Sequence, residues 1–142
     1  MATIFLDSNV FLYAVGSDGD LRVPCGSILQ AVAEGSVDAT TNSEVIQEIL
    51  HVLRRKARHS DALLVARRVS LLFPDLLPVT QADMARAIDI LAGDPTLPTR
   101  DAVHAATMRG AGISHIVTAD RDFDRVEGVL RLEPRDFPWA GV

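Results

Sequence analysis

The chain has 142 residues, 48% hydrophobic and 23% charged, which fits one globular domain over residues 1–142 and excludes a disordered chain or a coiled-coil rod. Its apolar runs fall short of the roughly 18 residues of a membrane span, and residues 2–6 are too short for a signal peptide, so we expect a cytoplasmic protein without a membrane segment. The net charge of −5 argues against coating nucleic acid by bulk charge but allows an enzyme with a small acidic site.

The first forty residues predict two strands and two helices. The apolar run that ends at Asp7 is typical of a strand buried on both faces. Pro24 fits the first turn of a later helix, and Gly35 fits the position after its end. Cys25 is the only cysteine, which excludes an internal disulfide and a cysteine-based zinc site, and we expect it to be a small apolar residue on that helix. The predicted elements are a strand at 2–6, a helix at 8–15 that stops at the polar stretch 16–20, a helix at 21–34 and a strand at 37–41.

The rest of the chain alternates helices with short apolar segments. Asn42 or Ser43 can cap a long amphipathic helix, and Thr99 can cap a later one. Strands that alternate with helices predict an α/β fold with a central, mainly parallel sheet, and no linker divides the chain. The predicted elements are helices at 43–58, 60–73, 81–92 and 100–110, strands at 115–118 and 129–134, and an apolar segment at 76–80 whose composition is compatible with a strand.

Aspartates stand at the junctions of these elements. Asp7 directly follows the first strand, Asp120 follows the strand at 115–118, and Asp101 lies in the first turn of the helix at 100–110. Each one alone is well explained as a helix cap or a turn residue. Together they indicate a site, because the carboxyl ends of parallel strands meet at one edge of the sheet.

A glutamate of the helix at 43–58 can join these aspartates. At about 100° per residue, the apolar residues centre nearly opposite Glu44, whereas Glu48 falls at the border of the apolar arc. Exposure and the helix dipole explain Glu44 in the first turn. We therefore choose Glu48 as the residue that lines a cleft and keep Glu44 as the alternative.

Four clustered carboxylates repel one another, so a site that holds them needs protons or a cation. Oxygen ligands without histidine or cysteine suit a hard ion, Mg²⁺ or Mn²⁺. Such an ion lowers the pKa of a bound water and clamps the oxygens of a phosphate, so a phosphodiester is the expected substrate.

Three segments resemble the PIN-domain ribonucleases, and specifically the VapC-type toxins of toxin–antitoxin pairs: LDSNVFLYA at 6–14, QEILHVL at 47–53 and LPTRDAVHAATMRGAGISHIVTADRDFD at 97–124. The resemblance implies a three-layer α/β/α PIN fold, Mg²⁺-dependent cleavage of RNA, a homodimer and inhibition by a VapB-type antitoxin. Thr118 fits the family as a hydroxyl behind the metal ligands, and Ser8 stands where many relatives have threonine. The implied metal ligands and catalytic acids are Asp7, Glu48, Asp101 and Asp120, with Asp122 as an outer or water-mediated ligand.

Two groups of residues have two interpretations each. The basic residues at 54–58 and 67–68 form either a solvated face or a rim that tracks phosphates. His104 lies one turn after Asp101, and we expect a packed histidine rather than a catalyst, since the family does not require it.

Other functions compete with metal-dependent RNA cleavage by a toxin. An aspartate-based phosphotransferase needs a lysine beside its phosphoryl group, but the only lysine, Lys56, lies deep in a helix. Haloacid-dehalogenase-type enzymes also need aspartate two residues after the nucleophile, where this chain has Asn9. A housekeeping RNA-processing nuclease and a non-catalytic binding module stay open as alternatives.

Overall fold

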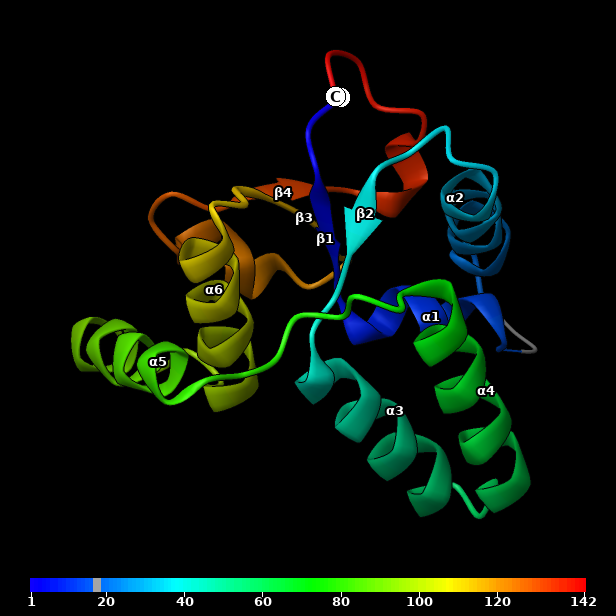
Figure 1. Cartoon of the computed structure of the whole chain (residues 1–142), viewed down its shortest axis with the longest axis horizontal. Helices are drawn as coiled ribbons and strands as arrows, with labels where there is room; N and C mark the ends of the chain where they lie inside the picture. The colour runs from blue at the N-terminus through cyan, green and yellow to red at the C-terminus, as the bar shows by residue number, and fades with distance from the viewer. Residues whose placement is uncertain (17–18) are drawn as a thin grey trace.

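The structure is a computed structural model that describes residues 1–16 and 19–142. A parallel sheet forms its centre. Within these residues the sheet has four strands in the order β2-β1-β3-β4, and each neighbouring pair is parallel (Figure 1). The strands are β1 (Ile4–Leu6), β2 (Ala39–Thr40), β3 (His115–Val117) and β4 (Leu130–Leu132).

β1 is the central strand, and its position fixes the place of Asp7. Phe5 pairs with Thr40 on one side and with Ile116 on the other, and all three residues of β1 are fully buried. The Asp7 N–H continues the β1–β3 ladder by donating to the Val117 carbonyl oxygen at 3.1 Å. The carboxylate of Asp7 therefore emerges from the middle of the sheet at its carboxyl edge.

Helices cover both faces of this sheet, as the predicted three-layer α/β/α fold requires. In Figure 1, α5 and α6 lie on one side, α1, α2 and α4 lie on the other, and α3 runs beneath the carboxyl edge. The helices are α1 (Ser8–Ala14), α2 (Arg22–Ala33), α3 (Ser43–Arg55), α4 (His59–Leu72), α5 (Gln81–Gly93) and α6 (Thr99–Ala111), with short 3₁₀ turns η1 (Arg121–Arg125) and η2 (Pro134–Asp136). Among the described residues, no helix is both long and apolar enough to cross a membrane.

The segment at 76–80 is not a strand. Leu77 forms one isolated bridge with Asn42, in which its N–H donates to the Thr41 carbonyl at 3.0 Å and its carbonyl accepts from Ser43 at 2.9 Å. Pro78 has no N–H to extend this ladder, and the partner chain turns into α3 directly after Asn42.

Other boundaries also differ from the sequence prediction. Thr99 is the first residue of α6 rather than its cap, because Pro98 occupies the cap position without a side-chain bond. α3 ends at Arg55 rather than near residue 58, and Ala57 adopts a positive φ of 58° in the turn to α4. The last strand is confined to Leu130–Leu132, and the predicted polar break at 16–20 includes residues 17–18, which lie outside the described residues. Cys25 is buried on α2, as predicted.

Candidate metal centre

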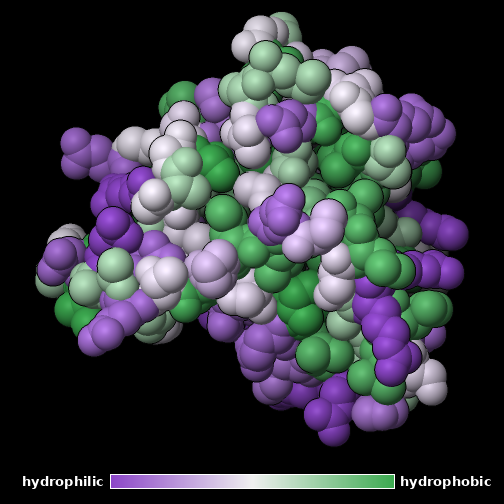
Figure 2. All heavy atoms as spheres, viewed as in Figure 1, coloured by the Kyte–Doolittle hydropathy of each residue, from purple (hydrophilic) through white to green (hydrophobic). Residues whose placement is uncertain are grey.

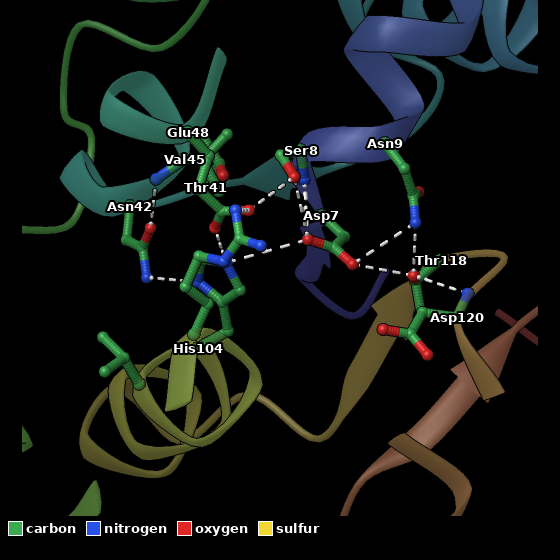
Figure 3. A network of polar contacts seen from close by, with 12 residues as sticks. Asp7, Ser8, Asn9, Thr41, Asn42, Val45, Glu48, His104, Thr118 and Asp120 are labelled. Carbon is green, nitrogen blue, oxygen red and sulfur yellow. Dashed lines mark hydrogen bonds and ion pairs between the residues drawn. The ribbon is translucent and has the colours of Figure 1, made fainter. Parts of the chain in front are cut away.

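Asp7 has two structural tasks at the end of β1. It is the N-cap of α1, where its Oδ1 accepts the Ser8 N–H at 2.7 Å, and its Oδ2 accepts the Thr118 hydroxyl at 2.7 Å (Figure 3). Asp7 is buried, with 4% of the relative area of the residue exposed. The hydrogen bonds therefore hold a nearly buried carboxylate in one orientation, which is what a ligand-positioning site requires.

Glu48 approaches Asp7 from α3, with both side chains linked to the same hydroxyl. Ser8 Oγ donates to Glu48 Oε2 at 3.0 Å and lies 3.4 Å from Asp7 Oδ1. The exposed guanidinium of Arg100 lies 3.6 Å from the same Glu48 oxygen. Glu48 is buried and Glu44 is half-buried, so the predicted phase of α3 is confirmed for Glu48.

The other three acids form a second group. Ligand oxygens of Asp101, Asp120 and Asp122 lie within 4.8 Å of one another. Asp120 caps η1 by accepting the Asp122 N–H at 2.9 Å, and the Asp122 side chain pairs with Arg125 at 2.9 Å. The Oδ2 of Asp101 is buried without any hydrogen-bond partner.

Thr118 connects the two groups. Its hydroxyl donates to Asp7 and accepts from the backbone N–H of Asp120 at 3.0 Å and from Asn9 Nδ2 at 2.9 Å. One donor and two acceptor sites exhaust the capacity of a hydroxyl. Thr118 therefore lies between Asp7 and Asp120 and holds the ends of β1 and β3 together at the site.

His104 belongs to the first group, which sequence reasoning did not anticipate. The ring is fully buried on α6, and its Nε2 hydrogen-bonds to Glu48 Oε1 and lies 3.7 Å from Asp7 Oδ1 (Figure 3). The expectation of a packed histidine is correct as far as burial goes, but the ring also touches both acids. The available signal is its spacing of three from Asp101, which puts both side chains on one face of α6.

The pKa values separate the acids. Burial raises the pKa of Asp7, although His104 and the Thr118 hydroxyl partly oppose the rise. Burial also acts on Glu48, but hydrogen bonds from His104 and Ser8 outweigh it and hold its pKa below the usual range. Burial, followed by the carboxylate of Asp120 and then that of Asp7, raises the pKa of Asp101 to about 8.

These residues fit a hard divalent cation. The sites consist mainly of carboxylate oxygens, which Mg²⁺ and Mn²⁺ prefer, and the unpaired Oδ2 of Asp101 is a buried acceptor that a cation would satisfy. The structure brings Asp7 together with Glu48, and Asp101 together with Asp120 and Asp122, as two adjacent groups. The assignment of all these acids to one metal site stays a prediction.

The basic residues of α3 and α4 lie away from this arrangement. Arg54, Arg55 and Lys56 are exposed at the end of α3, and Arg58 pairs with Asp61 at 2.9 Å. Figure 2 shows hydrophilic side chains over the tip where α3 meets α4. The structure thus places these charges on an exposed face, which both interpretations from the sequence allow.

Comparison with known proteins agrees with this fold. The PIN domain family matches residues 4–129. The chain is 35% identical over 135 residues to Ribonuclease VapC7 of Mycobacterium tuberculosis, covering 92% of this chain and 91% of that protein. It is 32% identical over 135 residues to Ribonuclease VapC13 of the same organism, covering 91% and 98%.

Solved structures share the fold at lower identity. The DNA-bound VapBC from Salmonella typhimurium superposes with a TM-score of 0.72 at 17% identity, covering 94% of this chain and 99% of that chain. Mycobacterium tuberculosis VapC20, described as a sarcin-ricin loop cleaving toxin, superposes with a TM-score of 0.69 at 20% identity, covering 85% and 92%. The chain therefore belongs to the PIN domain family, and within it to the VapC ribonucleases.

Proposed function

We propose that this chain is a Mg²⁺-dependent endoribonuclease, with Mn²⁺ as a substitute ion, and that it is the toxin of a type II toxin–antitoxin system acting in the cytoplasm. The observation that carries the proposal is the pair of acidic groups at the carboxyl edge of the sheet, connected through Thr118, with a buried Asp101 oxygen left unpaired. The names of the VapC ribonucleases that resemble this chain support RNA as the substrate.

We further propose that residues 1–142 form a single PIN domain. The family match ends at residue 129, but Phe137 and Trp139 beyond it pack against the hydrophobic core. Trp139 also donates its ring N–H to the Glu133 carbonyl at 2.8 Å. These contacts support one cooperative unit that includes the last residues.

In the proposed site, both groups of acids supply ligands to the cation. The cation would be held by Asp7, Glu48, Asp101 and Asp120, with Asp122 reaching it through water. When bound, it supplies a water of lowered pKa and neutralises charge on the phosphodiester. Asp7 and Glu48 are already oriented by Thr118, Ser8 and His104, so they contribute ligand oxygens without rearrangement. Asp101 has to give up the proton that its raised pKa favours.

A VapB-type antitoxin is the proposed partner. We expect its C-terminal segment to lay apolar residues against α1 and α2, where Tyr13 and Val23 are exposed. An arginine or lysine of the same segment would approach Asp7, Glu48 or Asp101, because a guanidinium pairs well with carboxylates. Inhibition and metal binding should then compete. We also propose a homodimer, which light scattering of the purified protein would test.

Two measurements test the function. The first incubates purified protein with total cellular RNA in Mg²⁺ or in a chelator and maps new 5′ ends, which should appear only with the metal. The second expresses the protein alone and with the product of the neighbouring gene, then titrates Mn²⁺ into the purified complex. New ends without toxicity or neighbour binding would favour the housekeeping nuclease, and the absence of cleavage with either ion would favour the non-catalytic module.

A further inference from the structure

Asn42 has a fixed orientation because it caps α3. Its Oδ1 accepts the Val45 N–H at 3.0 Å in the first turn of the helix, and the side chain is fully buried. An amide oxygen and nitrogen are hard to tell apart by shape, but only the oxygen can accept from a backbone N–H. The cap therefore directs the Nδ2 of Asn42 away from the helix and toward α6.

The two hydrogens of Asn42 Nδ2 each have one acceptor on α6. Thr107 Oγ1 lies at 3.2 Å, and its own hydrogen is donated to the Val103 carbonyl at 2.8 Å, so it meets Asn42 as an acceptor. The second contact is His104 Nδ1 at 3.1 Å. Since Asn42 Nδ2 has only hydrogens to offer, this ring nitrogen must present its lone pair.

A lone pair on Nδ1 puts the single ring proton on Nε2. That nitrogen faces Glu48 Oε1, with Asp7 Oδ1 at 3.7 Å. Burial lowers the pKa of His104, and the Glu48 hydrogen bond and the charges of Asp7 and Glu48 raise it, with a net rise. A second ring proton would nevertheless point at Nδ2 of Asn42, an amide nitrogen that cannot accept a hydrogen bond. The hydrogen-bond geometry thus opposes the doubly protonated ring.

We infer that Asn42 fixes the Nε2–H tautomer of His104, and that His104 in turn orients the Glu48 carboxylate in the candidate metal centre. Both act as positioning residues, and what Glu48 then does rests on the proposed function. The chain of contacts links the start of α3, the first half of α6 and the end of β1. The Nε2–H of His104 keeps a fixed direction in the plane of the ring, whereas the hydrogens of a hydroxyl or an amine can rotate.

The tautomer is tested in the metal-free protein without RNA. A long-range ¹H–¹⁵N spectrum distinguishes the two neutral forms and the doubly protonated ring of His104. We expect the Nε2–H form in the unmodified protein and a ring protonated at Nδ1 in Asn42→Asp, which keeps the helix cap but turns an acceptor toward the ring. Thr80→Asp is the matched control, because it also replaces a helix cap and adds one charge, at the start of α5. A proton on Nδ1 of the unmodified protein would overturn the inference.

The positioning role of His104 is tested by two substitutions whose amide groups lie at different distances from the backbone. The end of a glutamine amide falls near the place of Nε2, whereas an asparagine amide reaches only the place of Nδ1. Titration with Mn²⁺ alone should show His104→Asn weakened by about 10–100-fold and His104→Gln retaining most of the affinity. Equal losses in both variants would reduce His104 to a packing residue.

A third variant covers the case in which both replacements of His104 fail to fold. Asn42→Ser keeps a cap for α3 and removes the amide donor that opposes a proton on Nδ1. The Nε2–H still faces Glu48, so the ring should gain a second proton, on Nδ1, and Mn²⁺ affinity should fall. An unchanged spectrum would overturn the inference. If the unmodified protein shows the Nε2–H form but binds no Mn²⁺, the proposed function fails while the assignment of the tautomer stands.

Discussion

The two groups of acids at the carboxyl edge are built in opposite ways. Each oxygen of Asp7 and Glu48 receives a hydrogen bond from the protein, through Ser8, Thr118 or His104. Asp101, Asp120 and Asp122 instead face one another, and a buried oxygen of Asp101 has no partner. The first group has a donor at every carboxylate oxygen, whereas the second has donors at Asp120 and Asp122 but leaves Oδ2 of Asp101 without one.

The first group therefore has carboxylates of fixed orientation, whereas the second has a charge that can change. Donors on α1, on α6 and directly after β3 orient the first group. The second group has a pKa near 8 at Asp101, so its charge state depends on pH and on any cation that approaches. Metal and pH should therefore act mainly through Asp101, and loss of orientation mainly through Glu48.

The largest effect is expected for Asp101→Asn. The substitution keeps the shape of the side chain but removes one charge from the proposed ligands, so Mg²⁺-dependent RNA cleavage should fall by more than about 100-fold. Circular dichroism should show an intact fold. Asp136→Asn, at an exposed acid of η2, is the control and should cleave normally. Cleavage by Asp101→Asn at the normal rate would contradict the whole assignment.

A smaller loss is expected at Glu48, with Glu44 as its internal control. Glu48→Gln should lower cleavage by about 10–100-fold, because it replaces an oxygen that His104 and Ser8 hold in place. Glu44→Gln should change the rate little, since Glu44 makes its contribution in the first turn of α3. Single-turnover rates of both variants decide the order, and a larger loss at Glu44 would reverse the roles assigned to the two glutamates.

The raised pKa of Asp101 in the second group should make the stability of the protein depend on pH. Folded Asp101 holds its proton up to about pH 8, whereas the unfolded side chain loses it near 3.8. The folded state therefore binds more protons between these values, and the free energy of unfolding of the metal-free protein should decrease as the pH rises through this window. We expect a fall in Tm on the order of a few degrees by differential scanning calorimetry.

Two controls follow from this decrease of the free energy of unfolding with rising pH. Mg²⁺ added near pH 8 should restore the lost stability, because it binds the deprotonated carboxylates of the folded state. Asp101→Asn should flatten the pH profile and reduce the response to Mg²⁺. A metal-free Tm that rises between pH 4 and 8 would show that Asp101 is not the acid that carries the charge repulsion.

The smallest effect is expected for Asp122→Asn. Arg125 already pairs with this half-exposed side chain at 2.9 Å, and an exposed pair of this kind contributes less than about 1 kcal/mol. Mn²⁺ affinity, measured by calorimetry, should therefore fall less than about fivefold. If Asp122→Asn lowered Mn²⁺ affinity as much as Asp101→Asn does in the same titration, Asp122 would be a direct ligand instead of an outer one.

The sequence predicted those parts of the site that depend on local order. Asp7 and Asp120 follow apolar strands, so their place at the sheet edge can be read from their neighbours in the chain. The phase of α3 was enough to choose Glu48 over Glu44, because a helix has a fixed angle per residue. The fold class followed from the same alternation of strands and helices.

What could not be predicted depends on contacts between distant elements. His104 gains its two partners only when α6 packs beside α3 and β1, which no local pattern reveals. The division of the acids into two groups has the same origin, since Thr118 connects them across the sheet. The segment at 76–80, whose composition is compatible with a strand, forms only one isolated bridge, because Pro78 has no N–H to extend the ladder.

The central place of β1 also governs when a newly made chain can become active. Asp7 leaves the ribosome early, yet its hydrogen bond to Thr118 spans 111 residues, and β1 lacks one of its two neighbours until β3 has been synthesised. A polypeptide that is released after residue 101 but before residue 115 would contain Asp7, Glu48 and Asp101 but neither β3 nor Asp120. Such contacts at long separation form late in folding. Incomplete translation products would therefore be harmless to the cell, and nuclease activity would appear only as synthesis nears its end.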